Sequence, residues 1–142
     1  MRENLFRAKR KDNGEWVEGG LCIINKSPFI CYEMVKGLPK LTEVEENTIG
    51  QYTGLTDKNG TKIFEGDVLK NVMRWCDEER NGVVTFKDGA FGFIWYRGEV
   101  EMFHAFVSVV NIEYEVIGNI NDNPELLGDK QWNAQNICNY AN

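Results

Sequence analysis

The stretch GQYTGLTDKNGTKIFEGDVL, which runs from Gly50 to Leu69, decides the fold. At its centre lies the tetrapeptide Asp57-Lys58-Asn59-Gly60. Asp is favoured at the first corner of a type I turn, where its side chain caps the local backbone, and Gly is favoured at the last corner, where φ becomes positive. A type I turn closed by a left-handed Gly is a common hairpin connection. We therefore expect residues 52–55 to fold back against residues 62–65.

Working outward, two more segments extend this pattern. Glu65-Gly66-Asp67 interrupts the strand, and Gly permits a bend there before residues 68–72 resume it. Residues 82–96 form the clearest hairpin, because Asp88-Gly89 separates two alternating runs. Val84 and Phe86 should share one face of the first run. Phe91, Phe93 and Trp95 should share one face of the second run.

Turn signals recur about every ten residues without a long amphipathic helix between them, which is typical of an all-β sandwich or barrel. The second half of the chain predicts a small SH3-like barrel built from residues 62–65, 68–72, 82–87, 91–96 and 112–120. Residues 99–109 are apolar but irregular and supply a candidate extra strand. Asn123-Pro124 predicts a short helical turn near the C-terminus, with Asn123 as its N-cap.

The first half of the chain predicts an N-terminal β-hairpin lobe. Its strands are expected at residues 5–9, 15–19, 21–25 and 29–35, with a bend at Gly19-Gly20 and Trp16 packing across to Phe6. Residues 40–47 are polar and acidic and are expected to be a connection. The predicted organisation is therefore a lobe at 1–47, the barrel at 48–128 and a tail at 129–142.

The four cysteines, Cys22, Cys31, Cys76 and Cys138, lack zinc-ligand spacing, so we expect no metal site. A turn at Lys26-Ser27 would place Cys22 opposite Cys31, where a disulfide is geometrically conceivable. We expect two free thiols instead, because the cytoplasm is reducing. The N-terminus has no signal-peptide core and no apolar run is long enough to span a bilayer, so the chain is interpreted as cytoplasmic, without a membrane partner.

The chain carries a net charge of −6, which argues against a sequence-independent grip on nucleic acid. Residues 7–11, RAKRK, are the local exception. This run is either a solvated turn edge or a contact for a phosphate or an acidic partner.

No constellation of residues points to an enzyme. The single histidine, His104, lies in the apolar run MFHAF and is interpreted as structural. No nucleophile-elbow motif and no phosphate-binding loop is present in the sequence. We therefore expect no catalytic residue and no cofactor.

Three separated blocks resemble the YopX family of phage and prophage proteins. They are LFRAKRKDNGEWVEG at 5–19, the stretch at 50–69, and YEVIGNINDNPELL at 114–127. The resemblance covers residues 1 to about 128 in the family's order. It implies a mainly β protein with an SH3-like barrel, made by phages or prophages in a bacterial host. It carries no established activity and no assigned catalytic residue.

We expect such a protein to act by binding, as a protein-binding or self-associating module. The candidate partner surface comprises Arg7, Lys9, Arg10, Lys11, Trp75, Trp95 and Tyr96, with core packing as the other interpretation of Trp95. Another copy of the chain, or a host or phage protein, is favoured as the partner, and exposed strand edges favour self-association by strand addition. The alternatives are a nucleic-acid-associated accessory protein and an acidic decoy of a host nucleic-acid-binding protein.

Overall fold

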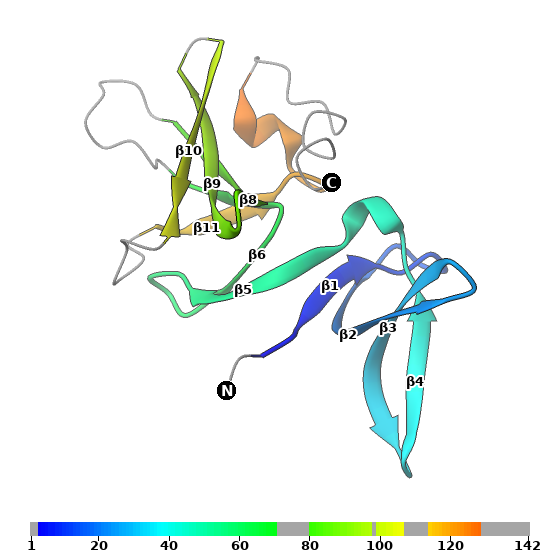
Figure 1. Ribbon diagram of the computed structural model, residues 1–142. Helices are drawn as coiled ribbons and strands as arrows, with labels where there is room; N and C mark the ends of the chain where they lie inside the picture. The colour runs from blue at the N-terminus through cyan, green and yellow to red at the C-terminus, as the bar shows by residue number, and fades with distance from the viewer. Residues whose placement is uncertain (1–2, 71–79, 98, 107–113, 129–142) are drawn as a thin grey trace. The chain divides into compact units, whose positions relative to one another are not determined.

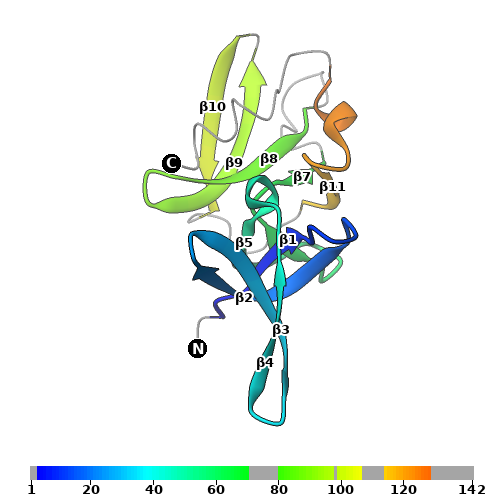
Figure 2. The ribbon, with the colours of Figure 1, turned by 90° about the vertical axis from the view of Figure 1, so that its right-hand side faces the viewer.

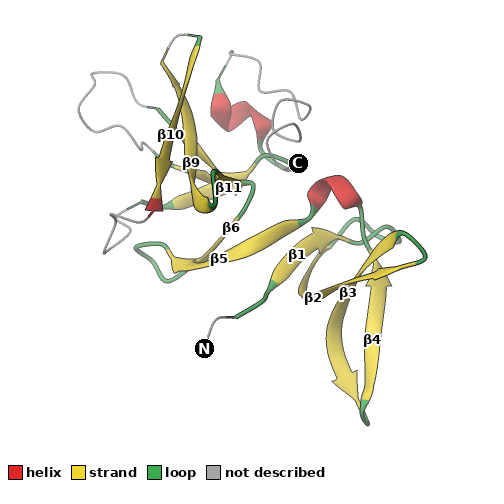
Figure 3. Cartoon of the chain, in the orientation of Figure 1, coloured by secondary structure: helices red, strands yellow, loops and turns green. Residues whose placement is uncertain are grey.

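The computed structural model describes residues 3–70, 80–97, 99–106 and 114–128, and it is mainly β (Figures 1 and 3). Its strands form two antiparallel sheets. The chain divides into two compact units, Met1–Gly54 and Leu55–Asn142, called unit 1 and unit 2 below. The division falls within a strand, whereas the sequence pattern placed it after residue 47. Within the described residues, no helix is long and apolar enough to cross a membrane.

Unit 1 is a sheet of sequential hairpins. Its elements are β1 (Phe6–Lys9), β2 (Trp16–Ile24), β3 (Ser27–Val35), β4 (Leu38–Glu43), the 3₁₀ turn η1 (Glu46–Thr48) and most of β5 (Gly50–Thr56). The strand order is β4-β3-β2-β1-β5. This arrangement confirms that the first part of the chain is built from hairpins.

The strand β2 is one continuous element that changes partner in its middle. Its first half pairs with β1, ending at the pair Phe6–Gly19, and its second half pairs with β3, starting at Gly20–Cys31. The expected bend at Gly19-Gly20 therefore does not separate two strands. Gly19 is required here, because a Cβ on it would lie only 1.9 Å from the carbonyl oxygen of Cys31.

The β2–β3 turn is centred one residue earlier than expected. Asn25 and Lys26 both have positive φ, 49° and 67°, as a two-residue type I′ turn requires. Cys22 consequently lies opposite Phe29. The predicted register, with Cys22 opposite Cys31, was therefore wrong by two positions, and the two thiols are free, as expected.

Residues 38–43 form the strand β4, although the sequence pattern predicted a connection from residue 40. A tight turn at Lys36-Gly37, with φ of 51° and 78°, folds this strand back along β3. The sequence pattern did not predict this strand, because most of its side chains are exposed. It also contains Pro39, a residue that within sheets is largely confined to edge strands.

The core of unit 1 is small. Ala8, Ile30 and Val44 are fully buried, and Phe6 and Val17 are among the partly buried residues that pack against them. The expected contact between Trp16 and Phe6 was wrong. Trp16 is paired with Lys9, and Phe6 with Gly19, so the alternation of side chains puts the two rings on opposite faces.

Unit 2 contains a five-stranded sheet in the order β10-β9-β8-β7-β11. The strands of this sheet are β7 (Asp67–Leu69), β8 (Gly82–Lys87), β9 (Ala90–Arg97), β10 (Val100–Ala105) and β11 (Val116–Asn119). Unit 2 also contains β6 (Lys62–Phe64), which pairs with β5, and the 3₁₀ turn η3 (Pro124–Leu127). The strand β10 is the extra strand expected in residues 99–109. The described residues form no closed barrel, since β10 and β11 lie at opposite edges of this sheet. The predicted barrel is therefore not observed.

The turn at the centre of the organising stretch is confirmed. The N–H of Gly60 donates to the carbonyl of Asp57 across 3.0 Å, and Gly60 has a φ of 81°. One carboxylate oxygen of Asp57 accepts hydrogen bonds from the N–H groups of Asn59 and Thr61. The bend at Glu65-Gly66-Asp67 likewise combines a glycine at positive φ with a capping aspartate. Gly66 has a φ of 87°, and the buried carboxylate of Asp67 accepts a hydrogen bond from the N–H of Phe64.

The hairpin of β8 and β9 is also confirmed, with Asp88 and Gly89 at φ of 52° and 80° in its turn. Its inward side chains Val84, Phe93 and Trp95 form the core of unit 2 together with Ile63, Leu69 and Phe106. The C-terminal turn η3 begins with Pro124, as expected. Asn123 stands at its N-cap position but does not cap it, because its side-chain oxygen accepts from the N–H of Asn119 instead.

Candidate functional site

The basic run lies on unit 1, where β1 places two of its cations against an aromatic ring. Arg7 and Lys9 are on the same face of β1, and Lys9 is paired with Trp16 of β2. The guanidinium carbon of Arg7 lies 4.9 Å from the centroid of the Trp16 ring, and Nζ of Lys9 lies 5.4 Å from it. Both distances are typical of cation–π contacts. The sequence pattern assigned Trp16 to packing against Phe6 and missed its contact with the two cations, which depends on the β1–β2 register.

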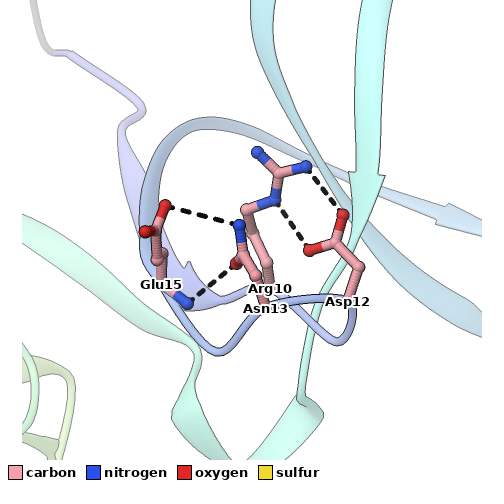
Figure 4. A network of polar contacts seen from close by, with 4 residues as sticks. All are labelled: Arg10, Asp12, Asn13 and Glu15. Atoms are coloured by element: carbon pink, nitrogen blue, oxygen red, sulfur yellow. Dashed lines mark hydrogen bonds and ion pairs between the residues drawn. The ribbon is translucent and has the colours of Figure 1, made fainter.

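The other two cations of the run are paired with acids, and Figure 4 shows the first of these pairs, Arg10 with Asp12. Arg10 binds both carboxylate oxygens of Asp12, at 3.0 and 2.8 Å, and Nζ of Lys11 lies 3.1 Å from Glu43. The hydrogen bond with Asp12 raises the pKa of Arg10, and the same bond lowers the pKa of Asp12. The hydrogen bond with Glu43 likewise raises the pKa of Lys11. These charges are already balanced locally, which weakens the run as a phosphate site.

The turn that follows β1 is itself held by polar contacts. The side-chain oxygen of Asn13 accepts from the N–H of Glu15 at 2.9 Å, and its amide nitrogen donates to the Glu15 carboxylate at 3.3 Å (Figure 4). Arg10 also lies over the ring of Tyr32 on β3, with 5.8 Å between the guanidinium carbon and the ring centroid. Asp12 and Tyr32 together fix the direction of the Arg10 side chain.

The remaining predicted surface residues, Trp75, Trp95 and Tyr96, belong to unit 2. Trp75 lies outside the described residues. Trp95 is 4% exposed and belongs to the core of unit 2, so it offers no surface to a partner. Tyr96 is half-buried, and its hydroxyl lies 3.2 Å from the carboxylate of Glu101, which also pairs with Lys87. Trp95 points inward because it stands on the same side of β9 as Phe93, as the alternation predicts.

His104 has an exposed side chain that stacks on the ring of Phe93, with 5.5 Å between the ring centroids. Its expected structural role is consistent with this packing against β9. Among the described residues, no group of three or more His, Cys, Asp or Glu side chains is arranged to hold a metal ion.

The most distinctive surface of unit 1 is apolar. Eight large hydrophobic side chains are exposed among the described residues, and six of them belong to β2, β3 and β4. These six are Ile23, Ile24, Tyr32, Met34, Leu38 and Leu41. Sequence reasoning missed them, because whether an alternating strand buries its apolar face depends on which strands cover it.

The exposure of four of these residues, Tyr32, Met34, Leu38 and Leu41, has a structural cause. The pairing of β2 with β3 stops at Cys31, whereas β3 and β4 remain paired to their turn at Lys36-Gly37. Beyond Cys31 the two strands therefore project as a two-stranded ribbon (Figures 1 and 2). We call residues 32–41 the β3–β4 arm. Within it Met34 is 61% exposed and Leu38 is 71% exposed.

Cross-strand contacts give the arm a defined shape. A register shift follows Cys31, after which Glu33 is paired with Lys40, Met34 with Pro39 and Val35 with Leu38. The carboxylate of Glu33 lies 3.2 Å from Nζ of Lys40. Because side chains alternate along each strand, Met34 lies on one face of the arm, whereas Leu38 lies on the other face together with the Glu33–Lys40 pair.

The fold and this surface define a mainly β protein of two compact units with an apolar projecting ribbon. The chain belongs to the YopX family, since the model of the "YopX protein" family matches residues 5–128. It is also similar to a solved structure, that of protein EF1440 from Enterococcus faecalis. The two are 28% identical, with a TM-score of 0.51, and the match covers 89% of this chain and 99% of that one. No curated protein matches the chain.

Proposed function

We propose that this YopX-family protein is a non-enzymatic binding module that associates with further copies of itself through the β3–β4 arm. The observation that carries the proposal is the concentration of exposed apolar side chains on hairpins β2 to β4. Exposed large apolar side chains are usually scattered singly on monomeric proteins, so several of them on neighbouring strands favour an interaction site. A ribbon of only two strands is also marginally stable by itself, so a protein surface that covers it would stabilise it.

The charge distribution supports a protein partner over a nucleic acid. Unit 1 contains eight basic and eight acidic residues, so it is neutral overall. Arg10 and Lys11, which would have to neutralise phosphates, already contact Asp12 and Glu43. A nucleic acid would have to displace both acids before it gained those contacts. Because these cations are already paired, a role as a nucleic-acid-associated accessory protein is the weaker alternative. A role as an acidic decoy is also weaker, because the net charge of −6 is modest.

The cellular setting of the proposal is the cytoplasm of a bacterial host, with the protein encoded by a phage or prophage. The free thiols of Cys22 and Cys31 suit a reducing compartment.

Size-exclusion chromatography with light scattering over a concentration series tests the proposal. The wild-type chain should show a mass above 16.3 kDa that rises with concentration. Leu38→Ser combined with Met34→Ser should shift the protein toward the monomer, because it removes the apolar contact. Lys26→Ser, an exposed polar change in the β2–β3 turn, is the control and should leave the mass unchanged. A wild-type chain that stays monomeric at high micromolar concentration would refute self-association.

A further inference from the structure

We infer that two copies of the chain pack face to face through one side of the sheet formed by β2, β3 and β4, in a symmetric contact that uses the same residues on both copies. We call this side, which is opposite the core of unit 1, the outer face. The inference rests on the proposed self-association and assigns it to one face of the sheet.

The strand register separates the two sides of this sheet. Leu21, Ile30 and Thr42 form one cross-strand row, and the fully buried Ile30 marks that row as the core side. Side chains alternate along a strand, so the next row, which pairs Cys31 with Leu41, lies on the outer face. The faces of all other paired residues of β2, β3 and β4 follow from these two rows.

The outer face is apolar, whereas the second face of an antiparallel sheet is commonly polar. Met34 belongs to it, because its partner Pro39 lies two positions before Leu41 on β4. The apolar residues of the outer face include Cys22, Ile24, Phe29, Cys31, Met34 and Leu41. Ile24 is 41% exposed and Met34 is 61% exposed. A sheet with apolar side chains on both faces is suited to a second covering layer.

The charge of this face fits a second copy of the chain. Within these rows of described residues, Glu43 is the only charged side chain, and Lys11 balances it across 3.1 Å. The net charge of −6 falls in unit 2, which has eight basic and fourteen acidic residues, whereas unit 1 has eight of each. Two copies can therefore meet through their outer faces without the repulsion that opposes a contact between two copies of unit 2. Identical neutral surfaces suit a symmetric contact.

The edge of β3 is open beyond Cys31, but it offers few backbone groups to another strand. Val35 flanks the β3–β4 turn and Glu33 lies two positions before it, so both direct their backbone hydrogen bonds to β4. This leaves Met34 facing the open edge, and the register shift at Tyr32 interrupts the edge before it. A ladder of one residue per copy is too short to hold two chains together, so the side chains of the outer face have to supply the contact.

The outer face is smaller than a standard protein interface. With strands about 4.8 Å apart and residues about 3.3 Å apart along each strand, three strands of roughly six residues cover on the order of 14 by 20 Å. A standard interface covers about 800 Å² on each partner. We therefore expect a weak dimer of two aligned sheets, whose population rises with the protein concentration.

Neighbouring residues on opposite sides of the sheet provide matched variants. Ile24 lies on the outer face, whereas Ile23, which is paired with the buried Pro28, lies on the core side and is the more exposed of the two at 64%. Ile24→Ser should raise the dissociation constant of the dimer by about tenfold or more, measured by light scattering over a concentration series. Ile23→Ser should leave the constant unchanged. Met34→Ser and Leu38→Ser form a second such pair, with Leu38 on the core side, and decide the point if circular dichroism shows that Ile24→Ser unfolds.

Two free thiols on the outer face report the contact directly. Cys22 and Cys31 are half-buried in one copy, and a second copy packed on this face should cover them further. Their alkylation by N-ethylmaleimide, followed at each cysteine by mass spectrometry of peptides, should slow several-fold as the concentration of the wild-type chain rises. In Ile24→Ser the rate should stay that of the monomer over the same concentrations.

The outcomes separate the two proposals. A wild-type chain that stays monomeric would refute self-association itself. Self-association that Ile24→Ser and Met34→Ser leave unchanged, or in which the alkylation rate does not depend on protein concentration, would overturn the outer-face contact and leave self-association in place. Equal losses from Ile23→Ser and Ile24→Ser would overturn it as well, because the core side of the sheet would then contribute as much as the outer face.

Discussion

The carboxylate of Asp57 accepts a hydrogen bond from the N–H of Val116 across 3.0 Å, which joins two segments 59 positions apart. The same carboxylate holds the β5–β6 turn through Asn59 and Thr61. The turn also receives a second contact from this region, because the N–H of Lys58 donates to the carbonyl of Tyr114 across 3.2 Å. One buried acid thus connects the central hairpin with β11 in unit 2.

Replacing this acid should destabilise the protein. Asp57→Asn keeps one acceptor oxygen but turns an amide group toward a backbone donor, so a buried N–H loses its partner. We expect the free energy of unfolding to fall by about 1–3 kcal/mol, measured by urea denaturation. Asp88→Asn is the matched control: Asp88 is exposed at positive φ, where Asn is well tolerated, and its loss should be within about 0.5 kcal/mol. Equal effects at both sites would contradict the special role of Asp57.

The stabilisation by Asp57 should depend on pH. Burial alone raises the pKa of this carboxyl, but hydrogen bonds from Val116, Thr61 and Asn59 lower it by a larger amount, so the net pKa lies below the ordinary value of 3.8. A lowered pKa in the folded state means that the contribution is complete above the ordinary value and is lost as the pH falls through it toward the folded-state pKa. The difference in unfolding free energy between wild type and Asp57→Asn should therefore shrink in acid. A difference that stays constant from pH 7 to pH 3 would show that the ionised form is not what matters.

Two adjacent glycines provide a test of the packing between β2 and β3. A Cβ on Gly19 would meet the carbonyl oxygen of Cys31 at 1.9 Å, whereas a Cβ on Gly20 would meet nothing within 4 Å. Gly19→Ala should reduce the free energy of unfolding by about 3 kcal/mol, because backbone must move to relieve the clash. Gly20→Ala should be neutral or slightly stabilising, because Ala restricts the unfolded chain more than Gly. Thermal melts of both variants decide the point, and a tolerated Gly19→Ala would mean that the two strands are further apart.

The sequence predicts a hairpin correctly where the turn residues are of types that favour the observed backbone conformation. In unit 2, Asp57 and Gly60, then Asp88 and Gly89, have side chains and φ values that specify their turns, and the hairpins were found from them. In unit 1 the β2–β3 turn is formed by Asn25 and Lys26. Because Lys seldom adopts positive φ, the sequence pattern placed the turn one residue later, next to Ser27-Pro28, and so predicted the wrong strand register. A shift of this kind moves every pair of that hairpin.

The candidate site was less predictable than the fold. The run from Arg7 to Lys11 was visible in the sequence, but its acidic neighbours include Glu43, which is 32 positions from Lys11. The exposure of Met34 and Leu38 depends on β2 leaving β3 at Cys31, a long-range event that no local pattern encodes. Trp95 had both a surface and a core interpretation, and only the assembled sheet distinguishes them.

The β2–β3 turn yields a last prediction, a stabilising one. Lys26 has a φ of 67°, a conformation that strains a side chain with a Cβ but not glycine. Lys26→Gly creates an Asn-Gly turn, the pair most favoured in two-residue hairpins, and should raise the free energy of unfolding by up to about 1 kcal/mol. Lys40→Gly, in the exposed strand β4, should instead lower it by about 0.5–1 kcal/mol, because glycine weakens a strand interior. Opposite signs for two Lys-to-Gly changes in one sheet, seen in parallel urea titrations, would confirm that the backbone conformation of Lys26 is the cause. Destabilisation by both changes would instead assign Lys26 a side-chain contact that outweighs its strained φ.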